Sequence, residues 1–541
     1  MKATISGQIA DVVAGRIFPG EIYVKEGRIV DIRETAKADK QLICPGLVDA
    51  HIHIESSMLI PSEFARLAVV HGTVATVSDP HEIANVTGVA GVEYMMDNGA
   101  SVPFYFNFGA PSCVPATRFE TAGAYIGPKE IEELLGRPSI KYLSEMMNYP
   151  GVLMKDPEVM EKIQIAQKFG KPVDGHAPGL RGIDAEKYVS AGISTDHECF
   201  TYEEALEKIK LGMKILIREG SAAKNFNALI ELISQYPDKI MFCSDDKHPD
   251  SLVKNHIDEL VRRALIYDFS PMDVLRAATL NPVKHYKLDN GLLQKGDYAD
   301  FIIVNNLMDF QVKQTWIRGQ KVAEKGRSLI QSVPSETINK FNGGYISQED
   351  IGVEAKTSRI KVIEVIEGQL ITRSNIMDAN IENGMVVADL DNDILKLVVV
   401  NRYETAPPAI AFVKNFELKQ GAIASTIAHD SHNIIAVGVD DESISRAINL
   451  LVQSKGGISL VSDSDHMTLP LPVAGLMSGK DGYEVALEYE NMDSAAKSMG
   501  CALAAPYMSL SFLALLVIPE LKLSDKGLFD GKNFRFTNLF V

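Results

Sequence analysis

The chain opens with short segments in which apolar and polar residues alternate. Residues 1–43 show this period of two between glycines, as in EIYVKEGRIVDI, and the pattern is typical of short antiparallel strands with tight turns. From residue 44 to residue 290 the pattern changes to short apolar runs, each followed by a segment of helical periodicity. That repetition is typical of consecutive βα units.

Eight apolar runs occur in this middle part of the chain. They are LICPGLVDAHI, TVATVSD, PFYFNFG, IKYLSEMM, PVDGHA, GISTDHE, MKILIRE and KIMFCSDD. Helical segments such as 157–169 and 251–268 lie between them. Eight βα units in roughly 240 residues have the size of a (β/α)8 barrel. The pattern therefore predicts an α/β fold with a TIM barrel over residues 44–290.

The segments around the barrel predict two further domains. Residues 291–334 return to short strands that could pair with residues 1–43 in one composite β-subdomain, with the barrel inserted between them. The polar, glycine-containing stretch 335–352 is typical of a linker. Residues 353–541 mix strand runs such as DILKLVVVN with a helix at 442–453, which predicts a C-terminal α+β domain.

The net charge and the cysteines indicate which binding partners and which cellular compartment to expect. A net charge of -17 disfavours nucleic acid, because binding to phosphates is driven by Lys and Arg. The five cysteines are scattered and lack a CxxC spacing, which favours the cytoplasm. The N-terminus does not resemble a signal peptide, and the apolar stretch 501–518 is interrupted by Pro506, so we interpret it as buried core and expect no membrane contact. A homodimer is expected only as the common default.

The candidate chemistry starts at His51 and His53. Two residues apart on a strand, both side chains project from one face and can reach one metal ion. The pair alone is a weak signal, but four other apolar runs also end in potential ligands, namely Glu145, His176, His197 and Asp245. Strand ends converge at the active-site face of such a barrel. The six residues could hold two divalent cations, with Glu145 as a bridging carboxylate and Asp245 beside the two histidines.

The order of these ligands resembles the amidohydrolase superfamily, whose barrels carry them on strands one, four, five, six and eight. The resemblance covers residues 1 to 330. Many binuclear members use a carboxylated lysine on strand four, whereas Glu145 ends this strand here. Lys141 lies four residues earlier, about 13 Å toward the barrel floor, so Glu145 is the better ligand.

Several longer sequence motifs resemble those of the adenine deaminases. They comprise PGLVDAHIHIESSM, TVSDPHEIANV, SEMMNYPGV, DGHAPG, STDHE and CSDDKHP, together with HDSHNIIAVG and LPLPVAGLMS near the C-terminus. The resemblance covers nearly the whole chain. It implies adenine and water as substrates, hypoxanthine and ammonia as products, a place in purine salvage, and Mn²⁺ as the usual cofactor. Four imidazoles and two carboxylates would also accept Fe²⁺ or Zn²⁺.

The expected mechanism needs a nucleophile, a base and an acid. A divalent metal lowers the pKa of bound water to about 7, which makes metal-bound hydroxide the expected nucleophile at C6. Asp245, as a ligand with a free oxygen, is expected to shuttle that proton to the departing amino group. N1 of the ring needs a further acid. Mononuclear relatives often use a glutamate just after the strand-five histidine, but alanine, proline and glycine follow His176 here. Glu82 and Glu55 remain the candidates.

Several residues keep two interpretations. Residues 78–80 resemble a helix start with an N-cap, which leaves His81 and Glu82 either with a metal or substrate role or on a helix surface. Asp246 follows Asp245, and because successive strand residues face opposite ways only one should be a ligand. The family pattern favours Asp245.

The HDSH segment of the C-terminal domain also has two interpretations. His429 and His432 either belong to a hydrogen-bonded turn or contribute to the active site by closing over the barrel mouth. Two rival functions remain for the whole chain. One is an amidohydrolase that acts on another nucleobase or a cyclic amide. The other is a non-catalytic interaction protein, which predicts missing ligands, whereas every expected ligand position is filled.

Overall fold

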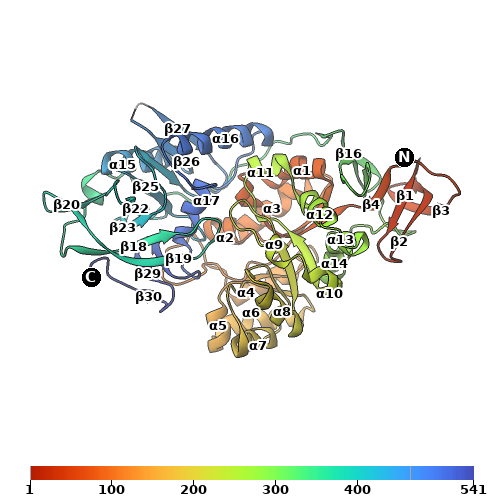
Figure 1. Cartoon of the computed structure of the whole chain (residues 1–541), viewed down its shortest axis with the longest axis horizontal. Helices are drawn as coiled ribbons and strands as arrows, with labels where there is room; N and C mark the ends of the chain where they lie inside the picture. Colours follow the sequence, from red (N-terminus) through yellow and green to blue (C-terminus); the bar gives the residue numbers. More distant parts are fainter. Residues whose placement is uncertain (1, 464) are drawn as a thin grey trace.

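The computed structural model describes residues 2–463 and 465–541. Figure 1 shows a small sheet around the N-terminus, a βα barrel in the middle and a sheet-rich C-terminal domain on the opposite side of the barrel. Within the described residues, no helix has the length and apolar character that a bilayer span requires.

Strands from both sides of the barrel segment build one eight-stranded sheet, with the order β17-β16-β15-β14-β4-β1-β2-β3. Its strands are β1 (Lys2–Asp11), β2 (Arg16–Lys25), β3 (Arg28–Glu34), β4 (Leu42–Pro45), β14 (Phe301–Val304), β15 (Val312–Ile317), β16 (Gln320–Glu324) and β17 (Arg327–Ser328). The seam between the two halves is the antiparallel pair β4–β14, where Ile43 lies opposite Ile303. The barrel is therefore inserted between two halves of one sheet.

The first apolar run is not one barrel strand, as the sequence pattern indicated, but two strands. Leu42–Pro45 belongs to the small sheet, and the barrel begins at Leu47. Gly46 separates them at a point of close packing, where an added Cβ would lie 2.4 Å from the Val74 side chain. Only glycine leaves room for the Val74 side chain against this backbone.

Eight positions around the barrel carry strands, one in each predicted apolar run. They are β5 (Leu47–His53), β6 (Thr73–Ser78), β7 (Tyr105–Phe108), β8 (Leu143–Met146), β9 (Val173–Gly175), β10 (Thr195–Asp196), β11 (Lys214–Arg218) and β12 (Ile240–Cys243), which continues as β13 (Asp245–Asp246). The parallel pair β13–β5 closes the ring. Ser194 N donates to Val173 O at 2.9 Å and so joins β9 to β10.

Helices cover the outside of the barrel. They are α1 (Pro61–Ala68), α2 (His81–Thr87), α3 (Val89–Ala100), α4 (Pro128–Leu135), α5 (Tyr149–Met154), α6 (Pro157–Lys168), α7 (Gly182–Ser190), α8 (Tyr202–Lys210), α9 (Phe226–Leu229), α10 (Leu232–Gln235), α11 (Pro249–Lys254), α12 (Ile257–Ile266), α13 (Pro271–Ala277) and α14 (Leu280–Tyr286). In α6 the Asp156 carboxylate accepts from the backbone N–H groups of Glu158 and Val159. This N-cap starts the helix where the sequence predicts it.

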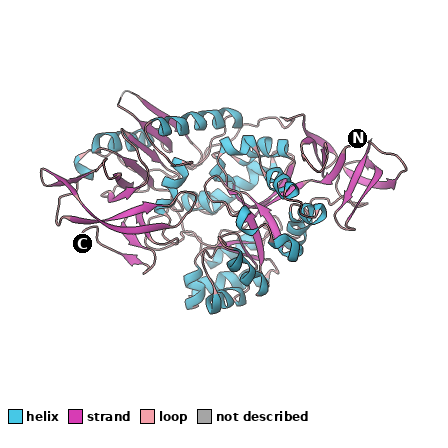
Figure 2. Ribbon diagram, viewed as in Figure 1, coloured by secondary structure: helices cyan, strands magenta, loops and turns pink. Residues whose placement is uncertain are grey.

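The C-terminal domain is built on a second eight-stranded sheet, which Figure 2 shows beside its helices. The sheet contains β18 (Arg359–Val365), β19 (Thr372–Asp378), β22 (Ile394–Val400), β23 (Ala409–Lys414), β24 (Ala422–Ser425), β25 (Ile434–Gly438), β26 (Gly457–Val461) and β27 (His466–Pro470). Its helices are α15 (Asp441–Ser454), α16 (Gly482–Ser498) and α17 (Pro506–Ser511). Two small sheets are formed by β20 (Asn380–Glu382) with β21 (Met385–Val387), and by β28 (Leu521–Ser524), β29 (Gly527–Asp530) and β30 (Arg535–Phe536).

Two predictions for this half of the chain can be compared with the structure. The helix predicted at 442–453 is α15. The apolar stretch 501–518 forms a short helix and a turn, and Leu510, Phe512 and Leu516 are buried in them. Its interpretation as core is therefore confirmed.

The predicted linker packs against both neighbouring domains. The N–H groups of Asn342 and Gly343 each donate to Arg402 O at 2.8 Å. At the other end, Tyr94 OH of α3 donates to Glu336 O at 3.0 Å. The segment is thus an extended tie between the barrel and the C-terminal domain.

Candidate active site

The six side chains predicted as metal ligands lie together at the C-terminal ends of the barrel strands. None is more than 5% exposed. They are His51 and His53 on β5, Glu145 on β8, His176 directly after β9, His197 directly after β10, and Asp245 on β13. The convergence follows from the fold, since parallel strands of a barrel end at one face.

Glu145 is at the centre of this group. Its Oε1 lies 3.2 Å from His53 Nε2. Its Oε2 lies 2.8 Å from His176 Nδ1 and 3.2 Å from His197 Nε2. The two oxygens of one carboxylate therefore face different histidines, an arrangement that suits a carboxylate shared between two cations.

The unsatisfied atoms of the site fit divalent cations. Among the described residues, His176 Nε2 and His81 Nε2 are buried without a hydrogen-bond partner. Buried polar atoms are normally paired, and imidazole and carboxylate donors suit Mn²⁺, Fe²⁺ and Zn²⁺. Burial lowers the pKa of His197, but Asp245 and Glu145 outweigh it and raise that pKa to about 9. A cation would replace such a proton and balance the same carboxylates.

Only one oxygen of Asp245 faces the site, because a hydrogen bond already holds the other. Arg218 Nη1 donates to its Oδ2 at 2.5 Å. Its Oδ1 faces the histidine pair, 3.5 Å from His51 Nε2 and 3.3 Å from His53 Nε2. Burial raises the pKa of Asp245, but Arg218 and the neighbouring histidines outweigh it and hold the pKa well below its usual range.

Asp246 does not turn away from the site, which corrects the expectation from strand alternation. It lines the cavity above the ligands, and its Oδ1 accepts from Ser56 Oγ at 2.5 Å. The cause is local, because Asp245 has a φ of 56°. A residue in this left-handed region breaks the alternation of a strand, and both carboxylates then reach the same side.

Glu198 and Arg218 belong to the site but were not predicted. Glu198 Oε1 lies 3.5 Å from His197 Nε2 and 3.7 Å from His176 Nδ1. Arg218, at the end of β11, bridges Glu198 and Asp245. Their signals were an acid directly after a strand-end histidine and an arginine at the end of the seventh apolar run.

His81 lies inside the site rather than on a helix surface. It is 3% exposed, and its Nδ1 lies 3.1 Å from Asp79 Oδ2 and 3.7 Å from Glu145 Oε1. The helix begins one residue later than the sequence indicated, at His81, with Pro80 in the N-cap position. Asp79 Oδ1 accepts from the His81 N–H at 3.1 Å, so Asp79 both starts the helix and faces the ring.

Glu55 and Glu82, the two candidate acids, lie behind the residues that line the cavity. Glu55 Oε1 accepts from the Ile83 N–H at 3.2 Å. Glu82 Oε1 accepts from Ser56 Oγ at 3.1 Å and lies 3.5 Å from His429 Nδ1. Burial raises the pKa of both carboxyls, that of Glu55 to about 8. His429 lines the cavity, whereas neither glutamate does.

The C-terminal domain closes the barrel mouth. His429 and Asp430 line the cavity, and Asp430 Oδ1 lies 3.6 Å from His81 Nε2. Three apolar residues of this domain line it as well, and we call them the roof: Leu370, Phe512 and Leu515. The volume of this cavity is about 20 Å³. His432 is buried nearby but does not line the cavity, so only the first histidine of HDSH reaches it.

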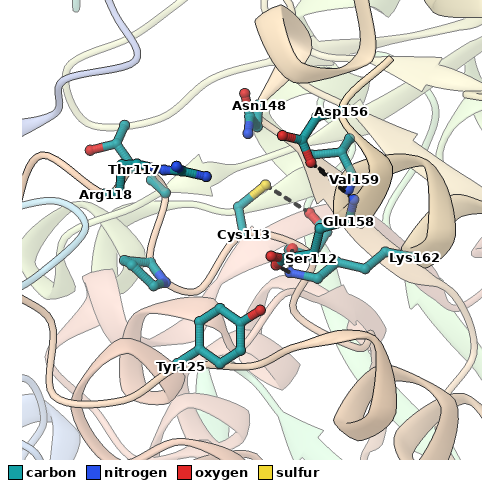
Figure 3. Close-up of a pocket in the computed structure, with 12 residues that line it drawn as sticks. Ser112, Cys113, Thr117, Arg118, Tyr125, Asn148, Asp156, Glu158, Val159 and Lys162 are labelled. Carbon is teal, nitrogen blue, oxygen red and sulfur yellow. Dashed lines mark hydrogen bonds and ion pairs between the residues drawn. The ribbon is translucent and has the colours of Figure 1, made fainter. Parts of the chain in front are cut away.

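Figure 3 shows the residues that line a second cavity, of about 160 Å³, among them Ser112 and Lys162. Ser112 Oγ donates to Glu145 O at 2.5 Å. Lys162 Nζ of α6 donates in turn to Ser112 O at 3.1 Å. Both residues line this cavity. The backbone that carries the central carboxylate is thus fixed from the outside of the barrel.

Comparison with known proteins agrees with this fold and site. Residues 42–322, more than half of the chain, match the amidohydrolase family model. The chain therefore belongs to the amidohydrolase family, and the barrel predicted from the sequence is confirmed. Residues 369–535 match the adenine deaminase C-terminal domain.

Relatives that match over nearly the full length identify the particular family within the amidohydrolases. The chain is 56% identical to an adenine deaminase of Sulfurovum sp. over 527 residues, 97% of either chain. It is 53% identical to that of Salinibacter ruber over 540 residues, 99% of either chain. The chain is a member of the adenine deaminase family, as its motifs predicted. A β-aspartyl dipeptidase from Fervidobacterium islandicum AW-1 aligns with 62% of this chain and 100% of its own, with 16% identity and a TM-score of 0.47.

Proposed function

We propose that this enzyme hydrolyses adenine at C6 to hypoxanthine and ammonia, with two divalent cations, Mn²⁺ foremost. The observation that carries the proposal is the combination of family membership over nearly the whole chain with a filled ligand set at one barrel mouth. The same proposal assigns the enzyme to purine salvage in the cytoplasm, which suits its five buried, unpaired cysteines.

Two ligand groups that share Glu145 would hold the cations. One contains His51, His53 and Asp245, whose ligand atoms lie within 4.8 Å of one another. The other contains His176 and His197, which face the second oxygen of Glu145. When bound, the cations would lower the pKa of water to about 7 and so make a nucleophile available at neutral pH.

Asp245 is the proposed proton acceptor, as the sequence suggested, but its carboxylate acts from a fixed position. Arg218 holds Oδ2 and keeps the group ionised, while Oδ1 faces the site. A base in this position can take a proton from the nucleophile and return it to the leaving amino group. The reaction releases ammonia, so one proton must reach that nitrogen.

His429, backed by Glu82, is the proposed acid for N1. Burial lowers the pKa of His429, but Glu82 and the other nearby carboxylates outweigh it and raise the pKa to about 9. The imidazole therefore carries a proton at neutral pH, and it lines the cavity that the ring would enter. Glu82, 3.5 Å from His429 Nδ1, can restore that proton. Glu55 contacts the backbone of Ile83 instead.

Metal analysis paired with turnover tests the proposal. Protein prepared with Mn²⁺, Fe²⁺ or Zn²⁺ is assayed for ammonia release from adenine, guanine, cytosine and a cyclic amide. We expect two metal equivalents per chain and the highest turnover with adenine and Mn²⁺. Absence of adenine turnover with all three metals would contradict the function, and faster turnover of another base would change the substrate.

A further inference from the structure

The roof over the cavity is formed by two separate segments of the C-terminal domain. Leu370 lies in the turn between β18 and β19, whereas Phe512 and Leu515 follow α17. Phe512 also stacks on the His429 ring, with centroids 4.4 Å apart and planes 6° apart. A movement of the roof would therefore also shift the imidazole of His429.

One side chain joins the two segments. Lys522, on β28, is fully buried, and its Nζ donates to Leu370 O at 2.7 Å and to Phe512 O at 2.9 Å. β28 is itself held to β19, because Thr372 Oγ1 donates to Leu521 O at 2.9 Å. The ammonium group thus ties both parts of the roof to one strand.

A buried lysine without a counter-charge is unusual. Among the residues that the structure describes, Lys522 forms no ion pair, and its partners are the two carbonyls. Burial lowers its pKa to about 7. An amine in such a place destabilises the fold relative to an apolar residue of similar size, so its position calls for a role that an apolar side chain could not fill.

We propose that Lys522 is a positioning residue for the substrate, because it holds Leu370 and Phe512 in register so that the roof packs on the face of the purine. The inference rests on the proposed function. Planar heteroaromatic ligands bind in pockets with apolar walls and a few polar groups. Here the barrel mouth supplies the polar groups, and the roof is the apolar wall.

The small size of the cavity implies that the roof moves, and Lys522 would set its closed position. A volume of about 20 Å³ holds one or two water molecules, since one water needs roughly 10–15 Å³. A purine is far larger, so the roof must move outward before adenine enters and close again over the ring. Lys522 determines the closed position, because both of its acceptors are backbone atoms of the roof segments.

Hydrogen exchange tests the tie without any substrate. In the Mn²⁺-loaded Lys522→Met variant, we expect backbone amides at 366–371 and 508–516 to exchange about tenfold faster than in the wild type. Lys526→Met is the matched control, since Lys526 lies in the same hairpin but donates to Glu120 O at 3.0 Å and does not contact the roof. Equal exchange in Lys522→Met and the wild type would overturn the proposal.

Steady-state kinetics test the link to the substrate. We expect Lys522→Met to raise KM for adenine about tenfold and to change kcat less than about threefold, the pattern for a lost binding contact. A fall in kcat with unchanged KM, or a loss of bound metal, would overturn the positioning role. Lys526→Met should match the wild type in both parameters.

Roof variants keep the proposal testable if Lys522→Met does not fold. Leu515→Ala and Phe512→Leu leave Lys522 intact, and each should raise KM for adenine more than it lowers kcat. An unchanged KM in both variants would overturn the proposal. If the wild type fails to turn over adenine with any metal, the proposed function fails, while hydrogen exchange still decides whether Lys522 holds the roof.

Discussion

Arg218 donates to Asp245 through a 2.5 Å hydrogen bond between two buried side chains. The same guanidinium contacts the carboxylate of Glu198. Burial opposes its charge, but Glu198 and Asp245 outweigh that effect and raise the pKa of Arg218. One cation therefore compensates two buried acids beside the ligand cluster.

Replacing Arg218 with methionine should destabilise the protein. The variant leaves Glu198 and Asp245 buried without their counter-charge, and breaking such a pair costs about 3–5 kcal/mol. Thermal unfolding of the metal-free protein should show a midpoint several degrees lower. The double variant Arg218→Met/Glu198→Gln removes one uncompensated acid and should recover part of the loss. An unchanged midpoint in Arg218→Met would contradict the pairing.

Glu145→Gln should remove metal from the site. The amide cannot bridge two cations as a carboxylate does, so we expect at most one metal per chain and adenine turnover reduced at least about 100-fold. Lys141→Met is the control on the same strand run, because Lys141 pairs with Asp289 at 2.8 Å, outside the ligand cluster. It should keep both metal and activity. Full metal occupancy in Glu145→Gln would refute the bridging role.

The two candidate acids should differ in their kinetic effect. Glu82→Gln should lower kcat by about 10²-fold or more, because His429, the proposed general acid, then loses the carboxylate that restores its proton. Glu55→Gln should lower kcat less than about tenfold, since Glu55 contacts the Ile83 backbone. Both are compared at equal metal content. A larger loss in Glu55→Gln would reverse the assignment.

Lys522 should make stability depend on pH in the alkaline range. Its pKa is about 7 in the folded protein, against 10.5 for an ordinary lysine. The unfolded chain therefore binds more protons between these values, and stability rises with pH across that window. Relative to Lys522→Met, the wild type should gain a few kcal/mol from pH 7 to about 10. If the unfolding midpoints of the wild type and of Lys522→Met change with pH in the same way, the lowered pKa of Lys522 is contradicted.

The sequence could predict the barrel and its six inward-facing strand-end residues because that information is local. An apolar run ending in a histidine or an acid marks a strand end, and the fold brings strand ends together. The prediction that Asp246 faces away from Asp245 was wrong because side chains alternate only along a regular strand. The backbone of Asp245, with a φ of 56°, is not regular strand.

Contacts between distant segments could not be predicted in the same way. Nothing near Arg218 in the chain indicates that it meets Asp245, since the contact depends on the order of strands around the ring. The histidines of HDSH lie three residues apart in an irregular turn, so spacing could not tell that His429 reaches the cavity and His432 does not. The roof depends on how a whole domain sits on the barrel.

The pairing of β4 with β14 has a consequence for biosynthesis. The ribosome releases β1–β4 first, and the β4 edge that pairs with Phe301–Val304 stays open until the entire barrel has been made. Open strand edges recruit other chains. A polypeptide that stops inside the barrel would carry such an edge permanently, and every nascent chain exposes it until β14 has been made.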